Sequence, residues 1–198
     1  DLRRVGPSGQ SWGTFLRNHA SEIWACDFLQ TYDALFCTIF VFVIIELESR
    51  RVVHANVTRH PTDAWVAQQL RNATPFGKGP RFLIRDNDKK FSHAFDTVFR
   101  SAGIHVIPIP HHAPNANAFA ERWVRSVREE CLDKVIILNE RHLRRVLHEY
   151  VEYYNTRRPH QGLKQDSPTG MLPVSPEGRV RYRNVLGGII RDYYREAA

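Results

Sequence analysis

The sequence predicts an α/β protein built on a five-stranded mixed sheet with helices on both faces. Three runs rich in Ile, Val and Phe lie within the first 57 residues and are joined by short polar connections, which is typical of antiparallel strands. Two further apolar runs are separated by segments of helical periodicity, which is typical of crossover connections. Of the 198 residues, 42% are hydrophobic and 25% are charged, which excludes the disordered, collagen-like and disulfide-scaffold classes.

The predicted strands are apolar segments bounded by turn residues. The second contains the longest apolar run, residues 34–45, whose 12 residues are too few to cross a bilayer, because a spanning helix needs about 20. Residues 48–51 form a polar turn after it, and residues 73–80, with two prolines and two glycines, form a loop. The strands are predicted at residues 21–29, 34–46, 52–57, 81–85 and 105–109.

Four helices are predicted from apolar periodicity and capping residues. Pro61 stands at a permitted first-turn position of the first helix, which runs to about residue 72. Ser92 can cap the second, whose apolar residues recur at helical spacing until Gly103 ends it. The other two helices are predicted at residues 117–132 and 140–154.

The chain is predicted to have three parts. Residues 1–20 are polar and mixed and form an N-terminal arm, and residues 21–160 contain the predicted sheet and helices. Residues 161–198 form a C-terminal basic tail with a short strand at 180–182. Two interpretations of this tail stay open, because its arginines can contact DNA and its aromatic residues can pack against a neighbouring subunit.

The chain is basic. It has 28 Lys and Arg against 21 Asp and Glu, a net charge of +7 and a pI near 9.6. Of the basic residues, 23 are Arg, whose planar guanidinium matches phosphate oxygens two at a time. This favours a nucleic-acid partner, although a GC-rich genome gives the same bias. The three cysteines form no CxxC pair, which indicates a reducing compartment.

Acidic residues stand at three unusual positions. Asp27 lies inside an apolar strand, where a carboxylate is costly unless it is paired or binds a cation. Asp86 and Asp88 follow the fourth strand, at the strand end where ligands gather in α/β sheets. Glu121 lies near the start of the third helix, beside its apolar stripe. Each has a structural alternative: a backbone hydrogen bond for Asp27, a turn for Asp86 and Asp88, and an ion pair with Arg125 for Glu121.

Taken together, these acids predict a site for hard divalent cations. Carboxylates from a strand, a strand end and a helix can converge on such ions through their oxygen atoms. Two ions about 3.5–4 Å apart would activate an attacking oxygen and stabilise the leaving oxygen of a phosphodiester. The sequence contains no zinc-type spacing, GxSxG, P-loop or GxGxxG motif.

Six segments of the chain together resemble the integrase-core (DDE) transposases of bacterial insertion sequences, which are relatives of retroviral integrases. The similarity runs from about residue 12 to residue 194. The segments, in order, are WACDF at 24–28, HPTDAW at 60–65, LIRDNDKKF at 83–91, PNANAFAER at 114–122, REECLD at 128–133 and YNTRRPH at 154–160.

The resemblance implies a ribonuclease H-like fold and a catalytic, metal-binding triad of Asp27, Asp86 and Glu121. Between Asp86 and Glu121 lie 34 residues, near the family's spacing of about 35, whereas Asp88 would leave 32. Many relatives carry Gly where this chain has Asp88, so Asp88 is interpreted as a hydrogen-bond acceptor that supports the site or as an alternative ligand.

The implied function is DNA integration: magnesium-dependent cleavage at the 3′ ends of an element and strand transfer into target DNA, by two-metal phosphoryl transfer. Mg²⁺ is the implied cofactor, with Mn²⁺ able to replace it, and no small-molecule cofactor is expected. The implied partners are DNA, as element ends and as target, and further copies of the chain, with no membrane. The expected location is the bacterial cytoplasm, in association with the nucleoid.

Five residues near the triad are predicted to contact DNA. Their side chains are cationic or carry amide groups, which suits contacts to phosphates. They are Lys89, Lys90, Asn117, Arg125 and Arg128. Two alternative functions stay open: a ribonuclease H-like metal-dependent nuclease, and a catalytically silent DNA-binding protein derived from a transposase.

Overall fold

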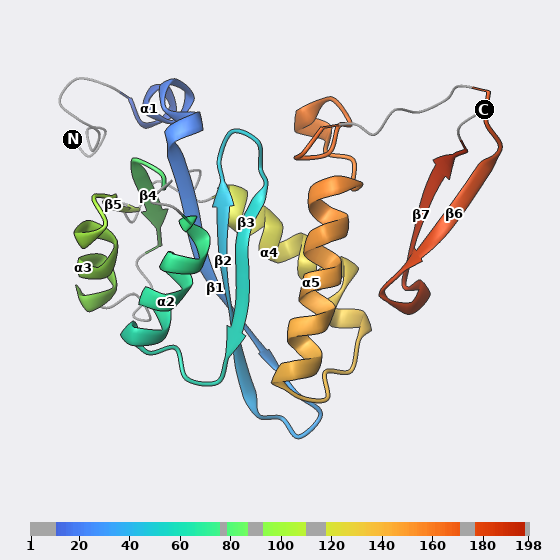
Figure 1. Ribbon diagram of the computed structural model, residues 1–198, viewed down its shortest axis with the longest axis horizontal. Helices are drawn as coiled ribbons and strands as arrows, with labels where there is room; N and C mark the ends of the chain where they lie inside the picture. Colours follow the sequence, from blue (N-terminus) through green and yellow to red (C-terminus); the bar gives the residue numbers. More distant parts are fainter. Residues whose placement is uncertain (1–10, 76–78, 87–92, 110–117, 171–176, 197–198) are drawn as a thin grey trace.

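The protein folds around a five-stranded sheet of order β3-β2-β1-β4-β5 (Figure 1). The computed structural model describes residues 11–75, 79–86, 93–109, 118–170 and 177–196. β1, β2 and β3 form an antiparallel meander, and β4 and β5 run parallel to β1, which confirms the predicted mixed sheet. The bounds are Ile23–Tyr32 for β1, Thr38–Glu46 for β2, Val52–Thr58 for β3, Phe82–Arg85 for β4 and His105–Pro108 for β5.

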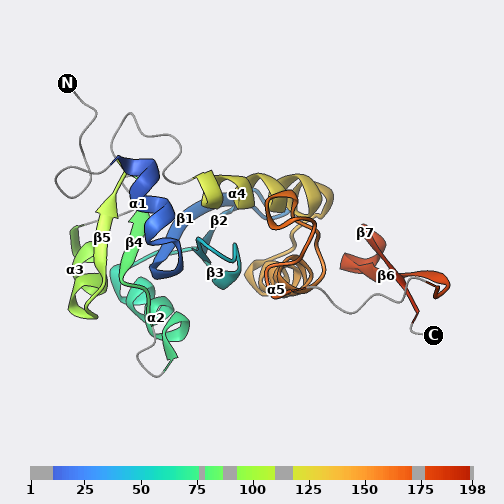
Figure 2. The ribbon, with the colours of Figure 1, turned by 90° about the horizontal axis from the view of Figure 1, so that it is seen from above.

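Helices cover both faces of this sheet. On one face, α2 (Asp63–Ala73) and α3 (His93–Ser101) pack against the Trp24, Cys26 and Phe28 side of β1. On the other, α1 (Trp12–Asn18), α4 (Ala118–Glu130) and α5 (Glu140–Thr156) pack against the side with Ile23, Ala25 and Leu29. Figure 2 shows α1 and α4 above the sheet and α2 below it. The alternation of β1 side chains therefore separates two apolar cores.

Capping residues fix several helix boundaries close to their predicted positions. Thr62 accepts a hydrogen bond from the Trp65 amide, so α2 begins at Asp63, two residues after the predicted Pro61 start. Asn139 accepts one from the His142 amide and begins α5. Gly103 has φ +78°, the left-handed conformation that follows helix ends, as expected after α3.

The second strand begins later than predicted. Residues 34–37 form the β1–β2 turn, because the buried Asp33 carboxylate accepts the amides of Leu35 and Cys37, both at 2.9 Å, and pairs with Arg59. Leu35 and Phe36 are consequently exposed. Because these two residues are hydrophobic, the strand was predicted to include them, whereas Asp33 in fact forms a turn there.

No helix was predicted within residues 1–20, whereas the structure has α1 there. Ser11 caps it, and Phe15 is fully buried with its ring 5.2 Å from that of Phe82. The only large apolar residues of the helix, Trp12, Phe15 and Leu16, stand at helical spacing but in too short a run to be recognised.

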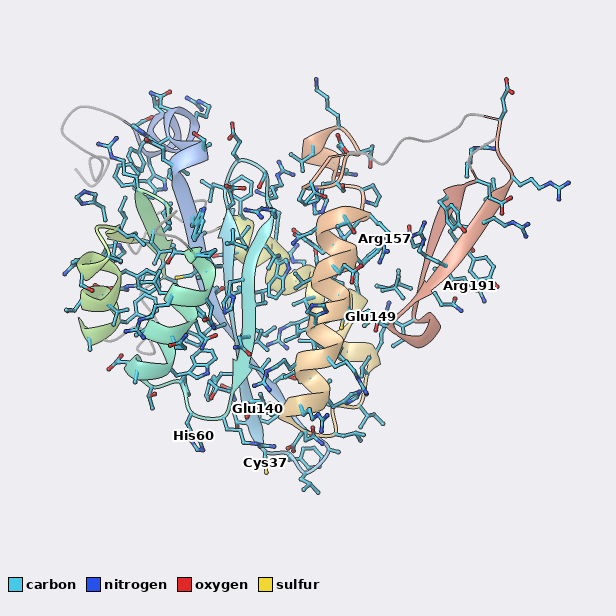
Figure 3. All side chains as sticks on the ribbon, in the orientation of Figure 1. Cys37, His60, Glu140, Glu149, Arg157 and Arg191 are labelled. Atoms are coloured by element: carbon cyan, nitrogen blue, oxygen red, sulfur yellow. The ribbon has the colours of Figure 1, made fainter. Side chains whose placement is uncertain are left out.

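A separate hairpin lies beside α5 (Figure 1). It consists of β6 (Val180–Val185) and β7 (Ile190–Arg195), so the strand predicted at residues 180–182 is longer than expected. The Leu186 amide donates to Glu149 Oε1 at 2.5 Å, and Arg157 pairs with Asp192 at 3.3 Å. In Figure 3, Arg157 and Glu149 both lie on the side of α5 that faces the hairpin. Within the described ranges, no helix has the length and apolar character needed to cross a membrane.

Candidate active site

Asp27 lies on the sheet face that α4 covers. Along β1, Ile23, Ala25 and Leu29 belong to the core beneath α4 and α5. Trp24, Cys26 and Phe28 belong to the other core. Asp27 continues the first series, since strand side chains alternate between faces. It is half-buried, and its Oδ1 accepts the Phe28 amide at 2.7 Å. The backbone bond considered from sequence is therefore present.

Asp86 follows β4 at the position beside Asp27. The parallel register of β1 and β4 ends with Cys26 opposite Arg85, and Asp27 and Asp86 are the residues that follow this last pair. Ile84 belongs to the core beneath α4, and the alternation along β4 places Asp86 on that face as well. Two sequence-predicted acids, far apart in the chain, are thus adjacent on one sheet face.

Arg85 holds the end of β4 from the opposite face. Its Nε and Nη2 donate to the two carboxylate oxygens of Asp96 on α3, at 2.7 and 2.8 Å. Its Nη1 donates to the Asp86 carbonyl at 2.8 Å. Both side chains of this ion pair are about nine-tenths buried. Because the pair fixes the backbone at Asp86, it is a positioning device for the carboxylate.

Glu121 lies in the first turn of α4 and is exposed. Ala120, Trp123 and Val127 bury the helix against the same core as Ala25. Arg128 Nη2 donates to the Gln30 carbonyl at 2.9 Å and so fixes α4 along β1.

The positions along α4 and β1 bring Glu121 toward Asp27. Glu121 precedes Arg128 by two helical turns, about 10.5 Å, and Asp27 precedes Gln30 by a similar length of strand, about 10 Å. The helix and the strand run in the same general direction (Figures 1 and 2). Glu121 therefore lies along the part of β1 that carries Asp27. Among the described residues, no ion pair joins Glu121 to Arg125.

The three carboxylates do not form a closed metal site in this structure. In the described part of the chain, no group of three or more His, Cys, Asp or Glu side chains is placed to hold an ion. The donor chemistry fits Mg²⁺, because two adjacent aspartates and a glutamate supply the hard oxygen ligands that this ion prefers. The structure places Asp27 and Asp86 on the sheet face that α4 covers and Glu121 on α4 itself, but among the described residues the three side chains do not form a group that could hold an ion.

The acids make the local potential negative. Burial raises the pKa of the Cys26 thiol well above its ordinary value, and the carboxylates of Asp27 and Asp86 raise it further, while Arg85 opposes them. The thiol is therefore neutral and cannot act as a nucleophile.

The residues predicted to contact DNA have different placements. Arg125 is exposed on α4, whereas Arg128 is half-buried and bonded to Gln30, so its guanidinium has a structural role in holding the helix. Lys89, Lys90 and Asn117 lie outside the described residues, as does Asp88.

A basic cavity on the other side of α4 was not predicted from the sequence. This cavity has a volume of about 770 Å³ and lies between α4, the end of α5, residues 158–165 and the β2–β3 turn. Four arginines line it: Arg50, Arg122, Arg125 and Arg158. The sequence feature that could have indicated this cavity is the segment from Arg157 to His160. It belongs to one of the segments that resemble the family, but no ligand was predicted for it.

An internal ion pair stabilises one wall of the basic cavity. Arg158 donates to both carboxylate oxygens of Glu130 at 2.5–3.1 Å, and Tyr150 donates to the same carboxylate at 3.0 Å. His160 is buried with its ring edge-on to Tyr154, at 4.6 Å between ring centroids. This network fixes residues 158–160 against α5.

Two histidines, the half-buried His54 and the buried His160, give stability a predictable pH dependence. Burial lowers the pKa of His54, which contacts Gln69, and burial together with the Arg158 charge lowers the pKa of His160. The folded state therefore favours the neutral rings, and this stability is present above the ordinary value of 6.5 and is lost as pH falls through the lowered values. We expect the midpoint temperature of thermal unfolding to decrease when the pH is lowered from 7.5 to 5.5, and to decrease by less in His54→Gln. An equal fall in that variant would exclude His54 as a source.

Comparisons with known proteins agree with the resemblance stated from sequence. Residues 102–168 match the family model of the integrase core domain. The chain is 28% identical over 165 residues to an uncharacterized 39.2 kDa protein of insertion element IS476 from Xanthomonas euvesicatoria. It is 25% identical over 150 residues to an uncharacterized 31.7 kDa protein of insertion element IS407 from Burkholderia multivorans. These alignments cover 82% and 75% of this chain but 47% and 54% of the relatives, so the chain spans about half of their length.

Solved structures of retroviral integrases share the fold. The chain is similar to the simian T-cell lymphotropic virus intasome bound to a PP2A regulatory subunit, with a TM-score of 0.61 at 14% identity over 89% of this chain and 67% of that one. The catalytic core of BIV integrase matches with a TM-score of 0.55 at 19% identity, and the match covers 75% of this chain and 91% of that one. The magnesium complex of the HTLV-2 integrase core, in its trimeric form, matches with a TM-score of 0.56 at 15% identity, and the match covers 73% of this chain and 92% of that one. The predicted ribonuclease H-like fold is confirmed.

Proposed function

From the integrase-core match and the ribonuclease H-like fold, we propose that the chain is the catalytic core of a transposase that cleaves DNA at 3′ ends and joins those ends to target DNA. The observation that carries this proposal is that Asp27 and Asp86 directly follow Cys26 and Arg85, the last paired residues of β1 and β4, so that strand alternation puts both on the face that α4 covers. Ligand-binding residues gather at such strand ends in α/β sheets.

The three acids have distinct roles in this proposal. Asp27 and Asp86 would hold a divalent cation through their carboxylate oxygens, and Glu121 would contribute its carboxylate from α4. When bound, Mg²⁺, or Mn²⁺ in its place, supplies positive charge to the attacking and leaving oxygens of the phosphodiester. Arg85 keeps Asp86 in place, and Arg128 keeps α4 along β1. No covalent intermediate with the protein is needed, because both the donor and the acceptor are DNA.

The proposed partners follow from the same chemistry. Arg125 is exposed on α4, one turn beyond Glu121, where it can contact a backbone phosphate. We assign the same role to Lys89, Lys90 and Asn117 from sequence alone. Assembly of several copies on DNA and action at the bacterial nucleoid are further parts of the proposal, as is the division into arm, core and basic tail.

The test uses a substrate that needs no recognition of element ends. Strand transfer is reversible in principle, so a branched duplex that mimics its product should be resolved by the isolated chain. We expect Mg²⁺ or Mn²⁺ to support this rejoining, with no product in EDTA. Hydrolysis of an RNA–DNA hybrid without joining would instead support the nuclease alternative. DNA binding without any chemistry would support the catalytically silent alternative.

Asp88 provides a specific check on which acid after β4 binds the metal. We expect Asp88→Gly to retain substantial joining activity on the branched duplex, because the position beside Asp27 belongs to Asp86. The measurement is the initial rate relative to the unaltered chain. Complete loss of activity in Asp88→Gly, with retention in Asp86→Asn, would assign the ligand to Asp88.

A further inference from the structure

The basic cavity carries more positive charge than its walls neutralise. Arg158 is paired with Glu130, at 2.5 Å. Among the described residues, no ion pair involves Arg50, Arg122 or Arg125. These three cations come from two distant parts of the chain, the β2–β3 turn and α4, and meet at one cavity of about 770 Å³.

Two of these cations share one aromatic ring. The Arg50 guanidinium lies 5.4 Å from the centre of the Phe119 ring, and the Arg122 guanidinium lies 4.8 Å from it. Arg50 is half-buried, and burial followed by the Arg122 charge lowers its pKa. Stacking on the ring offsets part of the repulsion between the two guanidinium groups. Arg122 is exposed, so only Arg50 is partly desolvated, and an anion bound between the two guanidinium groups would offset both their repulsion and this partial burial.

Gly162 leaves room for the Arg50 side chain. A Cβ atom built at Gly162 would overlap the Arg50 guanidinium. The backbone of Gly162 is not in the left-handed region, so alanine can adopt its conformation, and the added methyl group would displace the flexible end of the Arg50 side chain. The loop after α5 therefore accommodates a guanidinium that lies directly against its backbone and faces the cavity.

We propose that the basic cavity binds a backbone phosphate of DNA, with Arg50 and Arg122 as its principal contacts and Arg125 as a third. The identification of the ligand as DNA rests on the proposed function. Guanidinium groups bind phosphate oxygens through paired hydrogen bonds, and partial burial strengthens the attraction. Arg122 adjoins Glu121 in the sequence, so the proposed phosphate contact and the candidate active site lie on the same turn of α4.

The experiment measures DNA binding without catalysis. A fluorescent 30-base-pair duplex of arbitrary sequence is titrated with the complete chain in EDTA, by anisotropy, at several NaCl concentrations. The variants are Arg50→Gln, Arg122→Gln and their combination. The matched control is Arg71→Gln, which removes the same charge from an exposed position of α2 on the opposite sheet face. Circular dichroism confirms that each variant is folded.

We expect the double variant to weaken binding about three- to tenfold near 0.15 M salt, and to reduce the slope of log K against log salt by about 0.9 for each phosphate that the protein no longer neutralises. Arg71→Gln should leave the slope unchanged. Gly162→Ala, which displaces the Arg50 guanidinium without changing the net charge, should weaken binding as Arg50→Gln does. Equal slopes for the double variant and Arg71→Gln would overturn the proposal, as would unaltered binding by Gly162→Ala.

Inorganic phosphate distinguishes a DNA site from a site for small anions. If phosphate raises the unfolding temperature of the unaltered chain but not of the double variant, while DNA binding is the same in both, the cavity binds free phosphate and the assignment to DNA is wrong. Failure of the proposed function has a different signature, because the unaltered chain would then bind the duplex with the expected salt slopes but would not join the branched substrate in Mg²⁺. Absence of any duplex binding by the unaltered chain would overturn the cavity proposal itself.

Discussion

Asp86→Asn and Asp27→Asn are each expected to lower the rate of DNA joining by at least about 10³-fold, since a neutral amide is a poor ligand for a divalent cation whose charge stabilises the reacting phosphodiester. The substitutions keep the shape of the side chains, so the fold should persist. The two aspartates directly follow Cys26 and Arg85, the last paired residues of the parallel strands β1 and β4. Removing one of them relieves their mutual repulsion, so the unfolding temperature should stay the same or rise.

Glu121→Gln should abolish joining as well, and it has a close control. Glu121 is exposed in the first turn of α4, and Glu129 is exposed near the end of the same helix. Glu129→Gln removes the same charge from a position without a proposed role, and its rate should match that of the unaltered chain. Single-turnover rates on the branched duplex, in Mg²⁺ and in Mn²⁺, provide the measurement. Full activity in any of the three acid variants would show that the residue concerned is wrongly assigned.

Asp96→Ala is expected to lower the free energy of unfolding by about 3–5 kcal/mol, because it leaves the buried Arg85 guanidinium without its carboxylate partner. Asp96 accepts two hydrogen bonds from Arg85, and both side chains are about nine-tenths buried. The midpoint of thermal unfolding should fall by roughly 10 °C for a chain of this size. Asp133→Ala, at an exposed position after α4, should change it by less than about 1 °C.

A double variant separates the structural role of this ion pair from its effect on the site. Arg85→Met combined with Asp96→Leu replaces both charges by apolar side chains and should restore much of the lost stability. It also removes the hydrogen bond from Arg85 to the Asp86 carbonyl. Joining should therefore stay reduced although the protein is stable. Recovery of both stability and activity would show that Arg85 does not position Asp86.

The sheet was predictable because its signals are local. Each strand is rich in apolar residues, and the short connection at residues 48–51 sets the antiparallel pairing of β2 and β3. The two aspartates were recognised as members of a candidate site because a carboxylate inside or directly after an apolar strand is unusual. Their adjacency follows from strand register, which the sequence could not specify before the strand order was known.

The features that were missed depend on contacts between distant residues. The basic cavity joins Arg50 in a hairpin turn to Gly162 in a loop that follows α5, more than a hundred residues later. Neither residue is unusual in its own segment. The β1–β2 turn was misplaced because the pairing of Asp33 with Arg59 makes two exposed apolar residues acceptable at a hairpin tip.

The unequal lengths of the central strands have a mechanical consequence. β1 continues from Asp27 to Tyr32 beyond its last pair with β4, and in the described residues only β2 accompanies it over that length. Beyond Asp27, β1 continues in its antiparallel pairing with β2. In the part of the chain that the structure describes, the segment of β1 up to Cys26 is therefore held by strands on both sides, whereas the segment beyond it is held by β2 alone.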